Sequence, residues 1–195
     1  MKKNHSFSII IIILSLALLC SYQIYYHFAD IEETNLVKEY YHAQDNKNID
    51  IKNISVTKSK KKEEYLGILS IPSIKLETGF YGKNSDKNNV NNSVTLLNES
   101  IMPDNNNSII YLAAHSGSGH LAYFNNLDKL KEDDIINVLY NTKKYYYAVY
   151  DIYEMVKNGE IIVNRNINEN YLVLTTCSKN NNMQLVILAK MINKM

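Results

Sequence analysis

One cysteine and one histidine in this chain lie where they could carry out covalent chemistry. Cys177 ends the run "YLVLTTC" and His115 ends the run "NSIIYLAAH", and both runs have the apolar, β-branched composition of strands. A cysteine is nucleophilic when it is partly exposed and a base or cation favours its thiolate, and histidine is the usual base. For each residue alone, an unreactive cysteine or a structural histidine is the simpler alternative. Together, the two strand ends favour nucleophilic catalysis.

The sequence lacks the common motifs of metal and nucleotide sites. It contains no CxxC, HExxH, GxGxxG or P-loop pattern, so we expect no metal and no cofactor. The formal net charge is +1, which gives no reason to expect a nucleic acid as partner. The second cysteine, Cys20, lies in an apolar N-terminal segment, so we expect no disulfide in the remainder.

The N-terminal segment is typical of a membrane anchor. Residues 7–28 carry no charge unless His27 is protonated, and about 20 apolar residues span a bilayer as a helix. Lys2 and Lys3 precede the span and favour a cytoplasmic N-terminus. A cleaved signal peptide is the alternative, although no small-x-small cleavage site follows closely. We therefore predict a cytoplasmic segment at 1–6, a single transmembrane helix at 7–28 in the cell membrane, and an extracellular remainder.

Residues 29–63 are predicted to form a stalk. The stretch "DIEETNLVKEYYHAQ" could form a helical turn or two, whereas "DNKNIDIKNISVTKSKKKEE" is polar and charged, with little to bury. A segment of the second kind cannot offset the entropy of ordering its chain. We expect an extended or mobile linker.

Residues 64–195 have the pattern of a mostly β domain. Short apolar runs recur along this part of the chain, a short helix is indicated at 119–130, and a hairpin is indicated around Asn141-Thr142. Many short strands with few helices are typical of a barrel or a sandwich. In the run that ends at Cys177, alternation places Thr175 and Cys177 on one face.

This part of the chain resembles a sortase, the membrane-anchored cysteine transpeptidase of Gram-positive bacteria. "LGILSIPSIKLETGFYG" looks like the opening strands of that family, and "SIIYLAAHSG" resembles the segment that carries its catalytic histidine. "LVLTTCS" is similar to the TLxTC signature: Leu174, Thr176 and Cys177 fit, and Val173 stands where the first threonine is usual. The resemblance implies a closed β-barrel with short helices over 64–195.

The resemblance also implies a reaction and its partners. Cys177 would be the nucleophile of a thiol protease and transferase, and His115 its general acid and base. Thr176, and less directly Thr175, would contribute to substrate binding. The implied substrates are secreted proteins with an LPxTG-like sorting signal, and the implied acceptor is an amine of the peptidoglycan precursor at the cell wall.

The sequence departs from the family at a third residue. Sortases carry an arginine on the last strand, in a pattern R-h-h-h-h-A with h apolar, and here the pattern is "QLVILA", which begins at Gln184. Arg165 is the only arginine in the chain and is a possible substitute. Two alternatives to a wall-anchoring transpeptidase therefore stay open. One is a weak or inactive sortase-like binding protein, and the other is a pilin-polymerising enzyme that uses a lysine amine.

Overall fold

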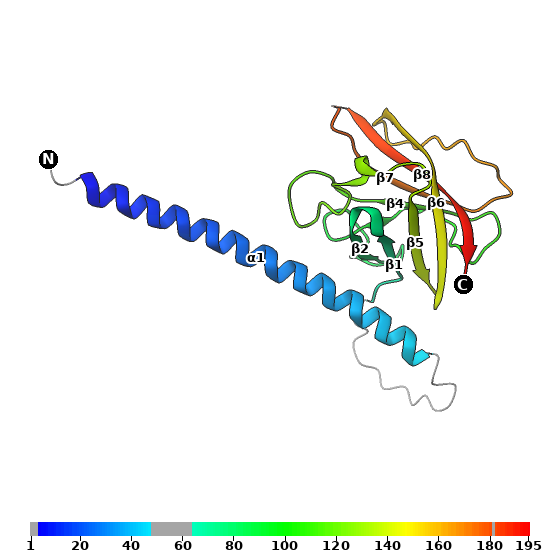
Figure 1. Cartoon of the computed structure of the whole chain (residues 1–195), viewed down its shortest axis with the longest axis horizontal. Coiled ribbons are helices and arrows are strands. Elements are labelled where there is room, and N and C mark those ends of the chain that lie inside the picture. The colour runs from blue at the N-terminus through cyan, green and yellow to red at the C-terminus, as the bar shows by residue number, and fades with distance from the viewer. Residues whose placement is uncertain (1–3, 48–63, 181) are drawn as a thin grey trace.

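A long helix precedes a mostly β domain in the computed structural model, which describes residues 4–47, 64–180 and 182–195 (Figure 1). The helix α1 (Asn4–Lys47) runs through the predicted end of the anchor at residue 28. Residues 29–47, in which we expected a helical turn or two at most, continue the same helix. The remainder of the predicted stalk, 48–63, and the first three residues lie outside the described part of the chain.

Eight strands form one sheet in the order β2-β1-β5-β6-β8-β7-β4-β3. The strands are β1 (Gly67–Ile71), β2 (Leu76–Phe80), β3 (Thr95–Leu96), β4 (Ile109–Ala113), β5 (Ile135–Tyr140), β6 (Lys143–Val156), β7 (Tyr171–Cys177) and β8 (Met183–Lys194). A bridge between Phe80 and Val94 brings the two outer strands together, so the sheet is a nearly closed barrel. The predicted mostly β barrel is confirmed.

The core fills the barrel with aromatic and branched aliphatic side chains. Tyr145, Tyr147, Phe80 and Phe124 are fully buried there. Strand β7 is buried along its whole length except at Cys177. It pairs in parallel with β4 on one side and antiparallel with β8 on the other, and a strand covered on both faces is expected to be continuously apolar. The cysteine therefore stands where the chain leaves the core.

Two local predictions had different outcomes. The hairpin is confirmed, because Asn141 and Thr142 adopt φ of 48° and 63° between paired strands β5 and β6, as a two-residue hairpin turn requires. The helix expected at 119–130 is reduced to the 3-10 turn η2 (Leu127–Lys129); a second such turn, η1 (Pro72–Ile74), follows β1. Gly119, at φ of 144°, and the two asparagines before η2 interrupt the helical pattern.

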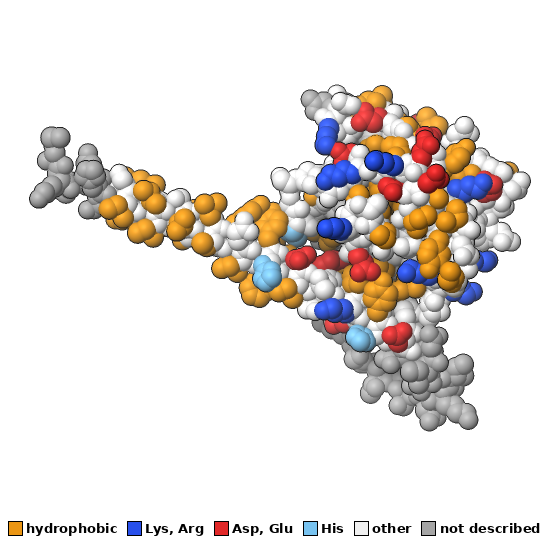
Figure 2. Space-filling model, in the orientation of Figure 1, with side chains coloured by type: hydrophobic (Ala, Val, Ile, Leu, Met, Phe, Trp, Pro, Cys, Tyr) orange, Lys and Arg blue, Asp and Glu red, His pale blue; other side chains and the backbone are white. Residues whose placement is uncertain are grey.

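The two halves of helix α1 have different surroundings. Its first half exposes a continuous series of large apolar side chains between Phe7 and Phe28 (Figure 2). Its second half packs against the barrel, where Val37 and Tyr40 are buried in a cluster with Tyr65. The helical segment Phe7–Asp45 contains an 18-residue stretch with a mean hydropathy of 2.3, and it is long and apolar enough to cross a membrane.

Candidate active site

The parallel pairing of β4 with β7 brings together the two residues that the sequence singled out. The register aligns Ala113 with Thr175, and the Thr176 hydroxyl donates to the Ala114 carbonyl at 2.8 Å. One residue further along each strand stand His115 and Cys177. The cysteine and the histidine therefore occupy neighbouring chain ends at one end of the barrel, although 62 residues separate them in sequence.

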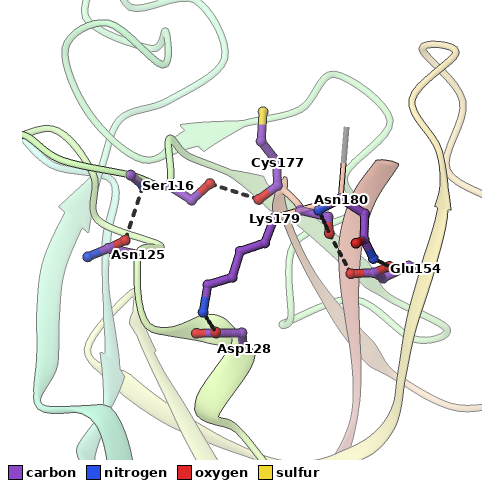
Figure 3. Close-up of polar contacts among 9 residues, drawn as sticks. Ser116, Asn125, Asp128, Glu154, Cys177, Lys179 and Asn180 are labelled. Atoms are coloured by element: carbon purple, nitrogen blue, oxygen red, sulfur yellow. Dashed lines mark hydrogen bonds and ion pairs between the residues drawn. The ribbon is translucent and has the colours of Figure 1, made fainter. Parts of the chain in front are cut away.

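Cys177 is exposed, and its surroundings hold it in place. Its backbone carbonyl accepts a hydrogen bond from the Ser116 hydroxyl at 2.7 Å, which links the chain after His115 to the chain at the cysteine (Figure 3). Its sulfur points away from the Lys179–Asp128 ion pair (Figure 3). The Lys157 ammonium lies 3.2 Å from the Cys177 sulfur. The thiol is thus accessible and lies next to a cation, as a nucleophilic cysteine requires.

His115 is exposed, and Asn91 orients its ring. The His115 Nε2 lies 3.3 Å from the Asn91 Oδ1, which can only accept a hydrogen bond. A neutral imidazole in this arrangement carries its proton on Nε2, so Nδ1 is the basic nitrogen. The His115 carbonyl accepts the backbone N–H of Phe124 at 3.0 Å, which anchors the histidine to the buried core.

Gln184 occupies the position directly opposite Cys177 in the β7–β8 pairing. Paired residues on neighbouring strands present their side chains on the same face, so this is where the family arginine would stand. Gln184 is only 9% exposed, and its Nε2 donates to the Glu160 carbonyl at 2.7 Å. One amide N–H is therefore used to hold the loop between β6 and β7.

The structure does not place Arg165 near this site. Its guanidinium donates to the Asn107 carbonyl at 3.2 Å, and Asn107 lies before the start of β4. His115 lies beyond the other end of that strand, about 25 Å away at the usual rise per residue. Arg165, considered as a substitute for the missing arginine, is thus at the opposite end of the barrel.

Thr175 and Thr176 are buried, and their hydroxyl groups bond to the backbone of neighbouring strands. The Thr175 hydroxyl donates to the Leu185 carbonyl at 3.1 Å, and the Thr176 hydroxyl donates to Ala114. These contacts fix β7 between its neighbours. They favour a role in positioning Cys177 over the direct substrate contact that we expected from the sequence motif.

A cleft of about 370 Å³ lies beside Cys177. Phe124 and Leu185 provide its apolar lining, and Glu154 and Asp128 line it with charge. Hydrogen bonds from Ser178 and then Asn180 lower the pKa of Glu154, and Lys179 lowers the pKa of Asp128, so both carboxylates are charged at neutral pH. An apolar hollow with a few charged groups at its edge suits an extended peptide.

Three neighbours of the pair were not foreseen from the sequence: Lys157, Asn91 and Ser116. Lys157 follows β6, and Asn91 lies in the loop before β3. Neither lies in a recognisable motif, and each is distant in sequence from the residue that it contacts, by 20 residues for Lys157 and 24 residues for Asn91. Ser116 directly follows His115 in the "HSGSG" stretch, and this adjacency in sequence was the one signal that could have pointed to it.

The comparisons with known proteins agree with this geometry. A family model described as the sortase domain matches residues 69–192. The chain belongs to the sortase family. Enzymes of this family are cysteine transpeptidases, and the predicted resemblance is confirmed.

Individual sortases are related to this chain at moderate distance. Sortase A of Bacillus anthracis is 27% identical over 127 residues, which are 65% of this chain and 59% of that protein. This chain thus matches less than two thirds of the length of that relative. Two solved structures share the fold with a TM-score of 0.60: a lid mutant of sortase A from Corynebacterium diphtheriae and a sortase D5 transpeptidase from Clostridium perfringens. They are 22% and 19% identical, and the matches cover 69% and 83% of this chain and 73% and 98% of theirs.

Proposed function

We propose that this sortase is a cysteine transpeptidase that cleaves an LPxTG-like sorting signal and transfers the surface protein to an amine of the cell wall. The observation that carries the proposal is the parallel pairing of β4 with β7, which brings the chain that leads to His115 next to the chain that leads to Cys177. An open cleft lies beside the cysteine. Catalysis by a thiolate and a histidine needs this neighbourhood and no cofactor.

The reaction proceeds in two balanced steps. The Cys177 thiolate attacks the scissile carbonyl, a carbon–sulfur bond forms, and the tetrahedral intermediate collapses with loss of the C-terminal fragment. That fragment leaves as an amine, which takes a proton from the His115 imidazolium. An acceptor amine then attacks the thioester and gives a proton to His115, and the carbon–sulfur bond breaks to restore the thiolate.

The site residues have distinct roles in this proposal. Cys177 is the nucleophile, His115 is the general acid and base, and Asn91 orients the imidazole through its 3.3 Å contact with Nε2. Thr175 and Thr176 hold the strand that carries the nucleophile. We assign no catalytic role to Arg165, because it is bound at the opposite end of β4.

The apolar half of α1 supports a membrane location for the enzyme. Residues 7–28 would span the bilayer once, and Lys2 and Lys3 favour a cytoplasmic N-terminus, which leaves the barrel outside the cell. Secreted substrates and precursors of the wall would then meet the site at the outer surface. The Lys2 and Lys3 side chains lie outside the described residues, so this orientation rests on the sequence.

Mass spectrometry of the full chain in detergent tests the proposal. The protein is incubated with a panel of LPxTG-like peptides, with a glycine amine, with a lysine amine, or with neither. We expect a thioester on Cys177 that the amine resolves, and no adduct in Cys177→Ala or His115→Ala. Cys20→Ser is the matched control, since it removes the other thiol of the chain without touching the cleft.

The outcomes of this experiment distinguish the candidate functions. Peptide binding without an adduct would overturn the transpeptidase and favour a binding protein, as the engaged Gln184 amide would then suggest. Resolution by lysine but not by glycine would favour a pilin-polymerising enzyme. Unimpaired cleavage by Cys177→Ala would refute the thioester mechanism.

A further inference from the structure

The residue at the position of the family arginine, Gln184, is neutral, so any positive charge at the site has to come from another residue. A neutral amide can donate a hydrogen bond but cannot balance a thiolate or an oxyanion with charge. One N–H of Gln184 is also already bonded to the Glu160 carbonyl. A cation that reaches the sulfur from another element would supply what Gln184 lacks.

Strand pairing places Lys157 on the face that carries the nucleophile. Across the three strands β6, β8 and β7, Met155, Gln184 and Cys177 stand in one row. Side chains alternate along a strand, so the residue two positions after Met155 shares its face, and that residue is Lys157. Its backbone N–H donates to the Asn182 carbonyl at 2.8 Å, which extends the β6–β8 pairing by one residue. This bond fixes the backbone position from which the Lys157 side chain extends.

The contact made by the Lys157 side chain agrees with this placement. Its ammonium lies 3.2 Å from the Cys177 sulfur. Three other cations that could be considered are engaged elsewhere. Lys179 pairs with Asp128, Lys190 pairs with Glu169 at 2.6 Å, and Arg165 bonds to a carbonyl at the far end of β4.

We propose that Lys157 is a catalytic residue that supplies the positive charge of this active site in place of the missing arginine. In the free enzyme its ammonium stabilises the Cys177 thiolate. When the thiolate attacks, the negative charge moves by two bonds, from the sulfur to the carbonyl oxygen, and the same ammonium follows it. An ammonium has three N–H donors on a flexible stem, so it can reach both atoms in turn. This role rests on the proposed transpeptidase function.

The two parts of this role have different kinetic consequences. Stabilising the thiolate raises the fraction of active nucleophile, but it does not by itself lower the barrier from thiolate to transition state. Stabilising the oxyanion more strongly than the thiolate does lower that barrier. A probe that reacts with the thiolate but forms no oxyanion therefore separates the two parts. Iodoacetamide is such a probe, because it alkylates sulfur by displacement of iodide.

The experiment uses the full chain in detergent with Cys20→Ser, so that Cys177 is the only thiol. Lys157→Met removes the charge and keeps an unbranched side chain, and Lys157→Arg restores a cation. Lys143→Met is the matched control. Lys143 is the exposed first residue of β6, the strand that Lys157 follows, and its replacement changes the net charge by the same amount. The alkylation rate and the peptide-cleavage rate are measured at pH 7 for each variant.

We expect Lys157→Met to slow alkylation by about fivefold, as an exposed ion pair allows. We expect it to slow peptide cleavage by a further factor of about 10 or more, since a lost oxyanion donor typically costs more than that. Lys157→Arg should recover most of both rates, and Lys143→Met should change neither.

Unchanged alkylation in Lys157→Met would overturn the thiolate contact. Equal losses of alkylation and cleavage would overturn the oxyanion role. The alkylation result stands even if no peptide of the panel is cleaved. In that case the proposed function fails, but the alkylation rates still show whether Lys157 is the partner of the Cys177 sulfur.

Discussion

Removal of the Glu33 carboxylate should release the second half of α1 from the barrel. This carboxylate receives four hydrogen bonds from the domain. Its Oε1 accepts from the Thr78 hydroxyl at 2.8 Å and the Gly79 N–H at 3.3 Å. Its Oε2 accepts from the Tyr65 hydroxyl at 2.7 Å and the Tyr123 hydroxyl at 3.3 Å. A single side chain of α1 therefore joins three separate segments of the domain.

The size of the effect follows from the two short bonds. A hydrogen bond to a charged acceptor contributes about 1.5–3 kcal/mol, and the lower figure applies because Glu33 is only partly buried. Counting only the bonds from Thr78 and Tyr65 gives about 3 kcal/mol, because each contributes about 1.5 kcal/mol. Since about 1.4 kcal/mol changes an equilibrium tenfold, Glu33→Ala should favour the undocked helix by about 100-fold.

Amide hydrogen exchange of the full chain in detergent measures this change. The end of a helix that has lost its tertiary contacts is marginally stable in water, so the amides of residues 34–45 should exchange about 100-fold faster in Glu33→Ala. Glu32→Ala is the control, because it removes the same charge from an exposed neighbour on the same helix. Exchange rates that rise equally in both variants, or in neither, would refute the reasoning.

Two further predictions concern pH and the missing arginine. Burial, and then the neighbouring carboxylate, raises the pKa of Tyr65 and Tyr123, so these phenols stay protonated in the folded state above pH 10, where unfolded tyrosine loses its proton. Their contribution to stability is therefore complete below about pH 9 and is lost as the pH rises above about 10. A midpoint of urea unfolding at pH 11 as high as that at pH 8 would contradict this prediction. Gln184→Arg should restore peptide cleavage at least about tenfold to the Lys157→Met protein, because it places a guanidinium opposite Cys177. Cleavage assays that show no gain would indicate that charge alone is not what Lys157 provides.

The barrel could be predicted from the sequence, and so could the candidate residues Cys177 and His115, but the relative position of those two residues could not. Both residues end apolar runs, and an apolar run that stops at a polar side chain marks a strand leaving the core. The pairing partner of each strand is a non-local property. Nothing near "YLVLTTC" indicates that it lies parallel to the strand before His115, and the contact with Lys157 depends on β6 lying next to β8.

The continuation of α1 beyond residue 28 was missed for a related reason. The stretch "DIEETNLVKEYYHAQ" has few apolar residues, and propensity alone does not hold such a segment in a helix. Its order comes from Val37 and Tyr40, which pack against Tyr65 and Tyr81. Those tyrosines lie in the barrel, so the helix is stabilised by a surface that its own sequence does not reveal.

The docked helix also connects the apolar first half of α1 to the loop that follows His115. The ring of His120 stacks edge-on against Tyr25 and Tyr26, at centroid distances of 5.4 and 5.6 Å, and the Tyr123 hydroxyl reaches Glu33. Both contacts lie in the segment that begins at His115.

With residues 7–28 in the bilayer, as proposed above, Glu33 stands only about 8 Å further along the helix axis, since each residue adds 1.5 Å. The barrel is then held at the membrane surface by a rigid connection, and its distance from the bilayer is set by the docking of α1. Substrates that are themselves tethered to the membrane would meet the cleft at a fixed height, so Glu33→Ala should impair their turnover more than that of free peptides. Equal losses for tethered and free substrates would show that the connection serves stability alone.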